Sequence, residues 1–178
     1  MEFREFPKIA RLHREIIVTE KIDGTCSVIC ITDDNQFLVG SRTCWITPKN
    51  DNHGFARWAY EHEEELRKLG PGSHYGEWWG MGIQRNYGLK EKRFSLFNVA
   101  RWADPDVRPK CCHVVPVLYQ GEFDTAKING CLMVLKSQGS VASPEFMNPE
   151  GIVIFHTAAN MCFKQTIEKD DVPKGLQK

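Results

Sequence analysis

The chain has 178 residues, of which 42% are hydrophobic, and its 23 Lys and Arg residues balance its 23 Asp and Glu residues. This length and apolar content fit one globular domain with a single core, and they exclude a disordered chain. The neutral total also excludes a chain that is basic throughout, so any contact with nucleic acid must use a local positive surface.

Targeting signals and cysteine usage indicate the compartment. No apolar stretch reaches the roughly 18–20 residues that a membrane helix needs, and several charges in the first twenty residues argue against a secretory signal. The seven cysteines are odd in number and include no C-x-x-C pair. Reduced thiols fit this pattern better than disulfides or zinc. We therefore expect a cytoplasmic protein with no membrane partner.

The order of apolar runs along the chain predicts an α+β domain with antiparallel sheets and flanking helices. The expected strands are residues 15–20, 26–31, 36–41, 74–79, 94–99, 151–156 and 160–166. The expected helices are residues 54–69 and 123–138, each followed by a glycine that ends it. Residues 1–168 are expected to form the domain, and residues 169–178 a mobile tail.

Lys21-Ile22-Asp23-Gly24 lies between two of the expected strands. A lysine at the tip of such a turn can project its amine into a cleft, and Gly24 lets backbone or ligand approach closely. Because the ordinary pKa of lysine is about 10.4, a nucleophilic lysine needs neighbouring cations or a desolvating pocket. By itself the tetrapeptide favours a solvated lysine in an Asp-Gly turn, so the catalytic interpretation depends on the motifs that follow.

Further motifs follow at ordered distances. They are Ser41-Arg42, Tyr75-Gly76-Glu77-Trp78, Phe94-Ser95-Leu96-Phe97-Asn98-Val99, Glu150-Gly151-Ile152-Val153 and Phe163-Lys164. Together with the first motif, this series resembles the covalent nucleotidyltransferase superfamily of ATP-dependent DNA ligases, RNA ligases and mRNA-capping guanylyltransferases. The resemblance covers residues 20–164 and implies the adenylyltransferase fold. Thr25-Cys26 is closer to the K-x-D-G-T-N form of RNA ligases than to the DNA-ligase form, with cysteine in place of the asparagine. The segment 82–89 resembles a stretch in small phage and bacterial RNA-ligase-domain proteins, which implies a bacterial or phage-infected cell.

The resemblance implies a catalytic role for three residues. Lys21 would attack the α-phosphate of ATP, form lysyl-AMP and release pyrophosphate. Asp23 would orient this lysine and a hydrated metal ion. Lys164 would contact the α-phosphate and neutralise developing charge.

The resemblance also implies a nucleotide-binding set, which includes Lys21 and Gly24. Glu20 would accept a hydrogen bond from the adenine amino group, which favours ATP over GTP. Arg42 would contact ribose or phosphate, and Phe97 would stack on the purine. Each of these three side chains is also compatible with an ordinary surface or core position.

Two glutamates complete the implied site. Glu77 would bind the ribose hydroxyls or assist the metal, and Glu150 would bind Mg²⁺ or Mn²⁺ as a hard carboxylate ligand. A glutamate beside a glycine and two tryptophans is an unusual place for an unpaired charge. We therefore expect Glu77 and Glu150 to share one ATP- and metal-binding site with Lys21 and Lys164.

The expected function is that of an ATP-dependent polynucleotide ligase, on RNA rather than DNA, that joins a 5′-phosphate end to a 3′-hydroxyl end, as in RNA repair. Arg85, Lys90, Lys92 and Arg93 are candidates for contacts to strand phosphates, although a solvated charged loop fits them equally well.

Two departures from the family pattern leave alternatives open. Thr166 stands where many members have a second lysine. We also expect no OB domain after residue 168, so a protein partner could supply the missing surface. The alternatives are a non-sealing AMP- or ATP-binding module that acts as a subunit or sensor, and a capping-type guanylyltransferase.

Overall fold

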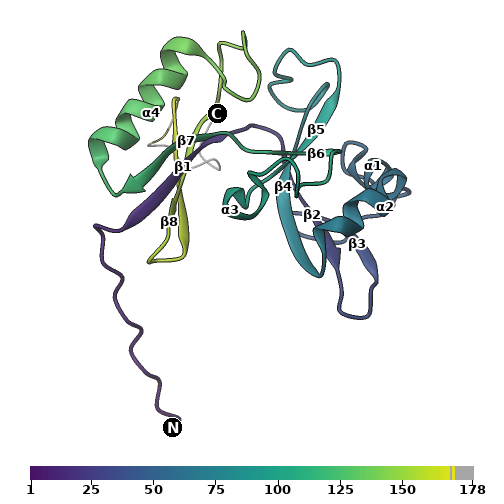
Figure 1. The fold of residues 1–178 in the computed structure, drawn as a ribbon, viewed down its shortest axis with the longest axis horizontal. Coiled ribbons are helices and arrows are strands. Elements are labelled where there is room, and N and C mark those ends of the chain that lie inside the picture. The colour runs from purple at the N-terminus through teal and green to yellow at the C-terminus, as the bar shows by residue number, and fades with distance from the viewer. Residues whose placement is uncertain (169, 171–178) are drawn as a thin grey trace.

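The computed structural model describes residues 1–168 and 170, which carry two β-sheets (Figure 1). The first sheet has the strand order β7 (Val117–Glu122), β1 (Glu15–Lys21), β8 (Gly151–His156) and β9 (Met161–Thr166). The second has the order β3 (Phe37–Ser41), β2 (Thr25–Ile31), β4 (Gly72–Gly80), β5 (Lys92–Leu96) and β6 (Cys112–Val114). Of the tail expected over residues 169–178, only Asp170 belongs to the described part.

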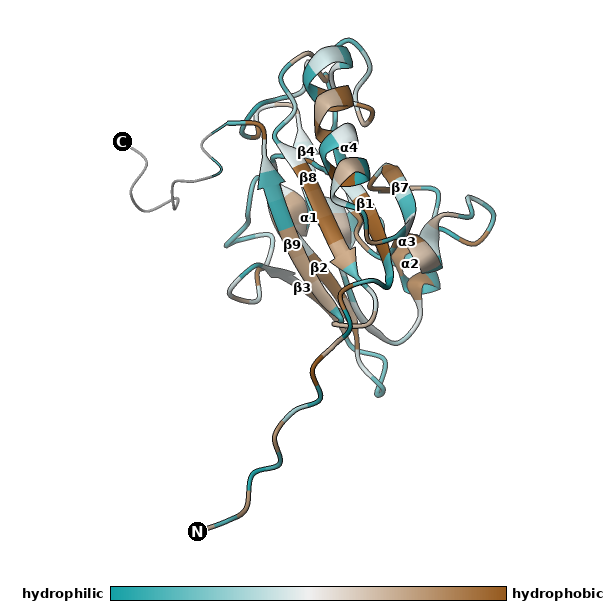
Figure 2. Ribbon diagram, turned by 90° about the vertical axis from the view of Figure 1, so that its left-hand side faces the viewer, coloured by the Kyte–Doolittle hydropathy of each residue, from teal (hydrophilic) through white to brown (hydrophobic). Residues whose placement is uncertain are grey.

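Helices cover one face of each sheet. The helices are α1 (Phe55–Glu61), α2 (Glu63–Leu66), the 3₁₀ turn η1 (Arg67–Leu69), α3 (Val99–Trp102) and α4 (Thr125–Gln138). Helices α1 and α2 pack on the outer face of the five-stranded sheet, and α4 packs on the outer face of the four-stranded sheet (Figure 1). Figure 2 shows the apolar colour along β1 and β8 under α4. Within the described residues, no helix is both long and apolar enough to span a bilayer.

Strand alternation gives each sheet an inner face on the side away from these helices. On β1, Ile16 and Val18 pack under α4, whereas Ile17 belongs to a third cluster that includes Trp79 of β4. This third cluster joins the two sheets. The residues that alternate with the helix-covered ones, Lys21 among them, therefore share the inner side.

The α+β prediction is confirmed, with one exception to its antiparallel sheets. Strands β5 and β6 pair in parallel, while the other strand pairs are antiparallel. Strands β6 and β7 and helix α3 were not predicted, because residues 99–122 lack a sustained apolar period. Without them, neither sheet would have its observed width.

Two predicted boundaries were wrong. The helix predicted over residues 54–69 breaks at His62, whose ring nitrogen lies 2.8 Å from the carbonyl oxygen of Trp58. The strand predicted to reach Val99 ends at Leu96, because Asn98 caps α3 by accepting a hydrogen bond from the backbone N–H of Arg101.

Candidate active site

Lys21 is the last residue of β1, and its side chain is paired with a glutamate from the far end of the chain. Its Nζ donates to Oε2 of Glu150 over 2.7 Å, and the two side chains are 20% and 7% exposed. Lys21 pairs in register with Gly151 of β8, so the sheet itself carries Glu150 to the lysine. The lysine is therefore held at a partly buried ion pair, not in bulk water.

Glu77 of β4 joins the same group of charges. Burial raises the pKa of the Glu77 carboxyl to about 7, while the Lys21 ammonium and the backbone N–H of Gly24 act to lower it. Glu150 and Asp23 raise it further by repulsion. Gly24 donates this N–H to Oε1 of Glu77 over 3.0 Å. Near neutral pH, Glu77 can thus exchange a proton within reach of Lys21.

Asp23 is fixed from both its side chain and its backbone. Its Oδ2 accepts from Nε of Arg85 over 3.0 Å, and its backbone N–H donates to the hydroxyl of Tyr87 over 2.9 Å. Sequence reasoning did not find these two partners. The only signal was the presence of Gly82, Asn86 and Gly88, which indicates a tight turn but not what it contacts.

Glu20 lies next to Lys21 in sequence, yet its carboxylate is hydrogen-bonded to the loop after α4. It is 1% exposed and accepts from the hydroxyl of Ser140 at 2.6 Å and from the backbone N–H groups of Val141 and Ala142 at 2.8 and 2.9 Å. Its role here is to anchor the loop after α4. The contact with an adenine edge stays a prediction. The three donors that already bind this carboxylate would compete with it.

Phe97 and Arg42 each lie one residue beyond the end of a strand of the five-stranded sheet, β5 and β3 respectively. Phe97 donates its backbone N–H to the carbonyl of Tyr75 and keeps 41% of its surface exposed. By alternation it shares a face with Ser95, which pairs with Glu77 in register. Arg42 is exposed and acts electrostatically on the thiol of Cys26, which also pairs with Glu77 in register. Purine stacking and ribose or phosphate contacts stay predictions.

Lys164 and Thr166 lie on the edge strand β9. Lys164 pairs with Val153, which pairs with Thr19 of β1. Lys164 therefore shares the inner face with Lys21, and two strand spacings across and two residues along β1 separate their Cα atoms by about 12 Å. Thr166 pairs with Gly151, and Gly151 pairs with Lys21, so these three residues form one row across the sheet. As a threonine it brings no positive charge to this position, and its hydroxyl donates to the carbonyl of Glu168.

The basic loop before β5 is largely engaged within the protein. Arg85 is bound to Asp23, Lys92 donates to the carbonyl of His53 over 2.7 Å, and Arg93 pairs with Glu91 over 2.6 Å. Of the four cations considered for strand phosphates, Lys90 alone is exposed without an ion pair in the described residues. These internal contacts argue against the loop as the main contact with the phosphates of a nucleic-acid strand.

The carboxylates of Glu150 and Glu77 fit a hydrated hard cation better than a cation held by protein ligands alone. No three His, Cys, Asp or Glu side chains among residues 1–168 and 170 gather closely enough to hold a metal ion by themselves. Mg²⁺ commonly binds through one or two carboxylates, water and substrate phosphates. Glu150 and Glu77, which sense each other's charge, match that mode, with a nucleotide supplying the phosphate oxygens.

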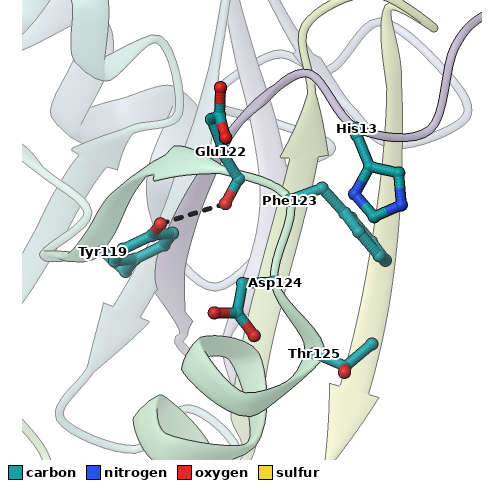
Figure 3. Close-up of a pocket in the computed structure, with 6 residues that line it drawn as sticks. All are labelled: His13, Tyr119, Glu122, Phe123, Asp124 and Thr125. Atoms are coloured by element: carbon teal, nitrogen blue, oxygen red, sulfur yellow. Dashed lines mark hydrogen bonds between the residues drawn. The ribbon is translucent and has the colours of Figure 1, made fainter.

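A separate hollow of about 430 Å³ lies at the opposite end of β1 (Figure 3). Its lining residues are His13, Tyr119, Glu122, Phe123, Asp124 and Thr125. Glu122 pairs with Glu15, the first residue of β1, which places the hollow about 20 Å along the strand from Lys21. It is therefore distinct from the group of charges around Lys21.

The chain is similar to known proteins in sequence and in fold. An RNA ligase family model matches residues 14–169. No match was found among curated protein sequences. Among solved structures, a variant of Naegleria gruberi RNA ligase with AMP and Mn aligns with a TM-score of 0.65 at 19% identity, over 86% of this chain and 49% of that one.

Two further variants of that ligase, both solved with ATP and Mn, give similar alignments. One has a TM-score of 0.64 at 22% identity, over 85% of this chain and 48% of the other. The second has a TM-score of 0.66 at 19% identity, over 88% and 51%. The predicted α+β domain thus has the fold of these structures, and the chain spans about half of their length.

Proposed function

This chain belongs to the RNA ligase family, and we propose that it is an ATP-dependent ligase that seals RNA through a lysyl-AMP intermediate. One observation carries the proposal: Lys21 is paired with Glu150 at 2.7 Å, beside Glu77 and close to Asp23. A lysine held among carboxylates at the partly buried end of an inner strand differs from an ordinary solvated lysine. It suits a nucleophile that its neighbours hold in place.

In the first step, the neutral amine of Lys21 attacks the α-phosphorus of ATP, and pyrophosphate leaves as the P–N bond forms. For this step the amine must lose its proton and leave the ion pair with Glu150. A Mg²⁺ or Mn²⁺ ion held by Glu150 and Glu77 would supply positive charge that stabilises the phosphates and favours the neutral amine. The solved relatives with AMP or ATP and Mn support this choice of nucleotide and metal.

Two transfers complete the reaction. The 5′-phosphate of one RNA end attacks the AMP phosphorus and displaces Lys21, which gives an adenylylated end. The 3′-hydroxyl of the other end then attacks the 5′-phosphorus, and AMP leaves as the phosphodiester forms. Lys164, on the same face as Lys21, is placed to offset charge on the phosphates.

The first step can be tested by labelling with [α-³²P]ATP and Mg²⁺ or Mn²⁺. We expect protein-bound label on the wild type and on Lys136→Ala, and none on Lys21→Ala, and the label should be stable to alkali and released by acid because it is held by a P–N bond. Lys136 is a suitable control because it is exposed on α4, which covers the opposite face of the sheet. Equal labelling of Lys21→Ala and the wild type would overturn the mechanism, and stronger labelling by GTP would favour the guanylyltransferase alternative.

Thr166 supports a second candidate function, that of a module that binds or transfers AMP without sealing. Its side chain stands in the row of Lys21 but brings no charge, and its hydroxyl is bonded to Glu168. Incubation with nicked 5′-phosphorylated RNA separates the two functions. Sealed product establishes the ligase, whereas lysyl-AMP without sealed product, even with excess RNA, favours the module or a requirement for a protein partner.

A further inference from the structure

The loop between β4 and β5 has a backbone shape that few side chains adopt. Gln84, Asn86 and Tyr87 have φ values of 44°, 62° and 51°. Such left-handed conformations are unfavourable for non-glycine residues and persist only where the surroundings impose them. The side chain of Asn86 accepts from the backbone N–H of Gly82 over 2.8 Å, which helps to impose this shape. The loop therefore presents Arg85 and Tyr87 in a fixed arrangement.

Arg85 bridges two segments that carry site residues. Its Nε donates to Oδ2 of Asp23, and one terminal nitrogen donates to Oδ1 and the backbone carbonyl of Asn148 at 2.8 and 3.1 Å. Asp23 lies two residues after Lys21, and Asn148 lies two residues before Glu150. A planar guanidinium can hold two segments at once, which a lysine ammonium does less well.

Tyr87 fixes the same turn through its backbone. Its hydroxyl accepts from the backbone N–H of Asp23, and the side chain is 1% exposed. The ring packs edge-on against Trp79 at 5.0 Å and tilted on Phe146 at 4.5 Å. The hydroxyl of Ser143 donates to the Tyr87 carbonyl over 2.8 Å. The hydroxyl of Tyr87 is thus a rigid acceptor, with little freedom to follow a moving turn.

From these contacts we infer that Arg85 and Tyr87 are positioning residues, which hold the turn after β1 so that Lys21 and Glu150 keep the geometry needed for attack on the α-phosphorus. This inference rests on the proposed function. It assigns Arg85 to the alignment of the site, in place of a contact with strand phosphates. Small misplacements of a nucleophile cost large factors in rate, so the effect falls on the chemical step and not on nucleotide affinity.

The test compares Arg85→Gln and Tyr87→Phe with Lys90→Gln, which removes an exposed cation from the same loop. Single-turnover formation of lysyl-AMP is measured over a range of ATP concentrations. We expect the rate at saturating ATP to fall about tenfold in Tyr87→Phe and about 10- to 100-fold in Arg85→Gln, with a half-saturating ATP concentration within about twofold of wild type. Lys90→Gln should match the wild type, and Arg85→Lys should recover part of the rate.

Amide hydrogen exchange of the free protein gives a second readout that needs no activity. The amides of residues 22–24 should exchange faster in Arg85→Gln and Tyr87→Phe, and at the wild-type rate in Lys90→Gln. Unchanged exchange, or faster exchange with wild-type rates of lysyl-AMP formation, overturns the inference. A parallel loss of RNA binding in Arg85→Gln and Lys90→Gln, with normal lysyl-AMP formation, also overturns it. If the wild type forms no lysyl-AMP, the proposed function fails, and exchange alone decides whether the two residues hold the turn.

Discussion

The backbone N–H of Gly24 donates to Oε1 of Glu77, which ties the turn after β1 to the middle of β4. This contact links the two sheets at the point where Lys21 leaves the first one. It also gives Glu77 a donor that favours its charged form, against the burial that favours its neutral form. The position of the lysine turn and the protonation of Glu77 are therefore coupled.

Gly24→Ala should destabilise the protein and abolish lysyl-AMP formation. A Cβ at this position would lie 2.7 Å from Cβ of Trp79, so the turn must move. We expect a loss of about 1–3 kcal/mol in the free energy of unfolding, measured in urea. Gly130→Ala is the control, because the added Cβ meets no atom within 4 Å and alanine favours helix α4. A stable, active Gly24→Ala would contradict the close approach.

The affinity for adenosine should rise with pH through about 7. A charged Glu77 accepts hydrogen bonds from ribose hydroxyls better than a neutral one, and its pKa is raised to about 7. Adenosine carries no group that titrates near neutral pH, so calorimetric titration at pH 6 and pH 8 reports on the protein. We expect up to about a tenfold difference in the wild type. The difference should vanish in Glu77→Gln, and a wild-type affinity independent of pH would contradict this role.

Glu77 should also make the protein less stable as the pH rises. Its pKa is 4.5 in the reference state and about 7 in the folded protein. The stability it contributes is therefore fully present below pH 4.5 and is lost as the pH rises to 7. Urea unfolding of Glu77→Gln and wild type between pH 4.5 and 8 should show the variant gaining relative stability over that range. A constant difference would mean that the carboxyl keeps its ordinary pKa.

Glu20→Ala should act on stability and leave nucleotide choice unchanged. Removing this buried carboxylate leaves the hydroxyl of Ser140 and two backbone N–H groups without their acceptor. We expect a loss of about 2–4 kcal/mol in the free energy of unfolding. Labelling by ATP and GTP should keep the wild-type ratio. A stable variant that loses the preference for ATP would instead support the contact with adenine expected from the sequence.

Phe97→Leu should weaken adenosine binding with little effect on stability. Phe97 is 41% exposed, and stacking of a base on an aromatic ring is worth about 1–3 kcal/mol. Phe94→Leu is the matched control. Phe94 is fully buried under α1, so its substitution should lower the free energy of unfolding instead. Calorimetry and urea unfolding separate the two effects. Wild-type affinity in Phe97→Leu would place the purine elsewhere.

The strands and helices with a clear apolar period could be predicted from the sequence. Apolar alternation predicted β1 and β2 on either side of Lys21, and helical spacing predicted α4 to within two residues of its start. Both signals come from neighbours in the chain, where backbone geometry fixes the direction of each side chain. The motif series likewise depends only on residue types and their order.

The partners of each charge were decided by the tertiary structure. Lys21 meets Glu150 across 129 positions, Gly24 meets Glu77 across 53, and Asp23 meets Arg85 across 62. The pKa of Glu77 and the anchoring role of Glu20 arise from burial and from donors brought by other segments, which no local pattern encodes. The sequence by itself determined which groups are present and on which local elements. Folding alone determined which of them meet, because strand pairing joins residues without regard to their distance along the chain.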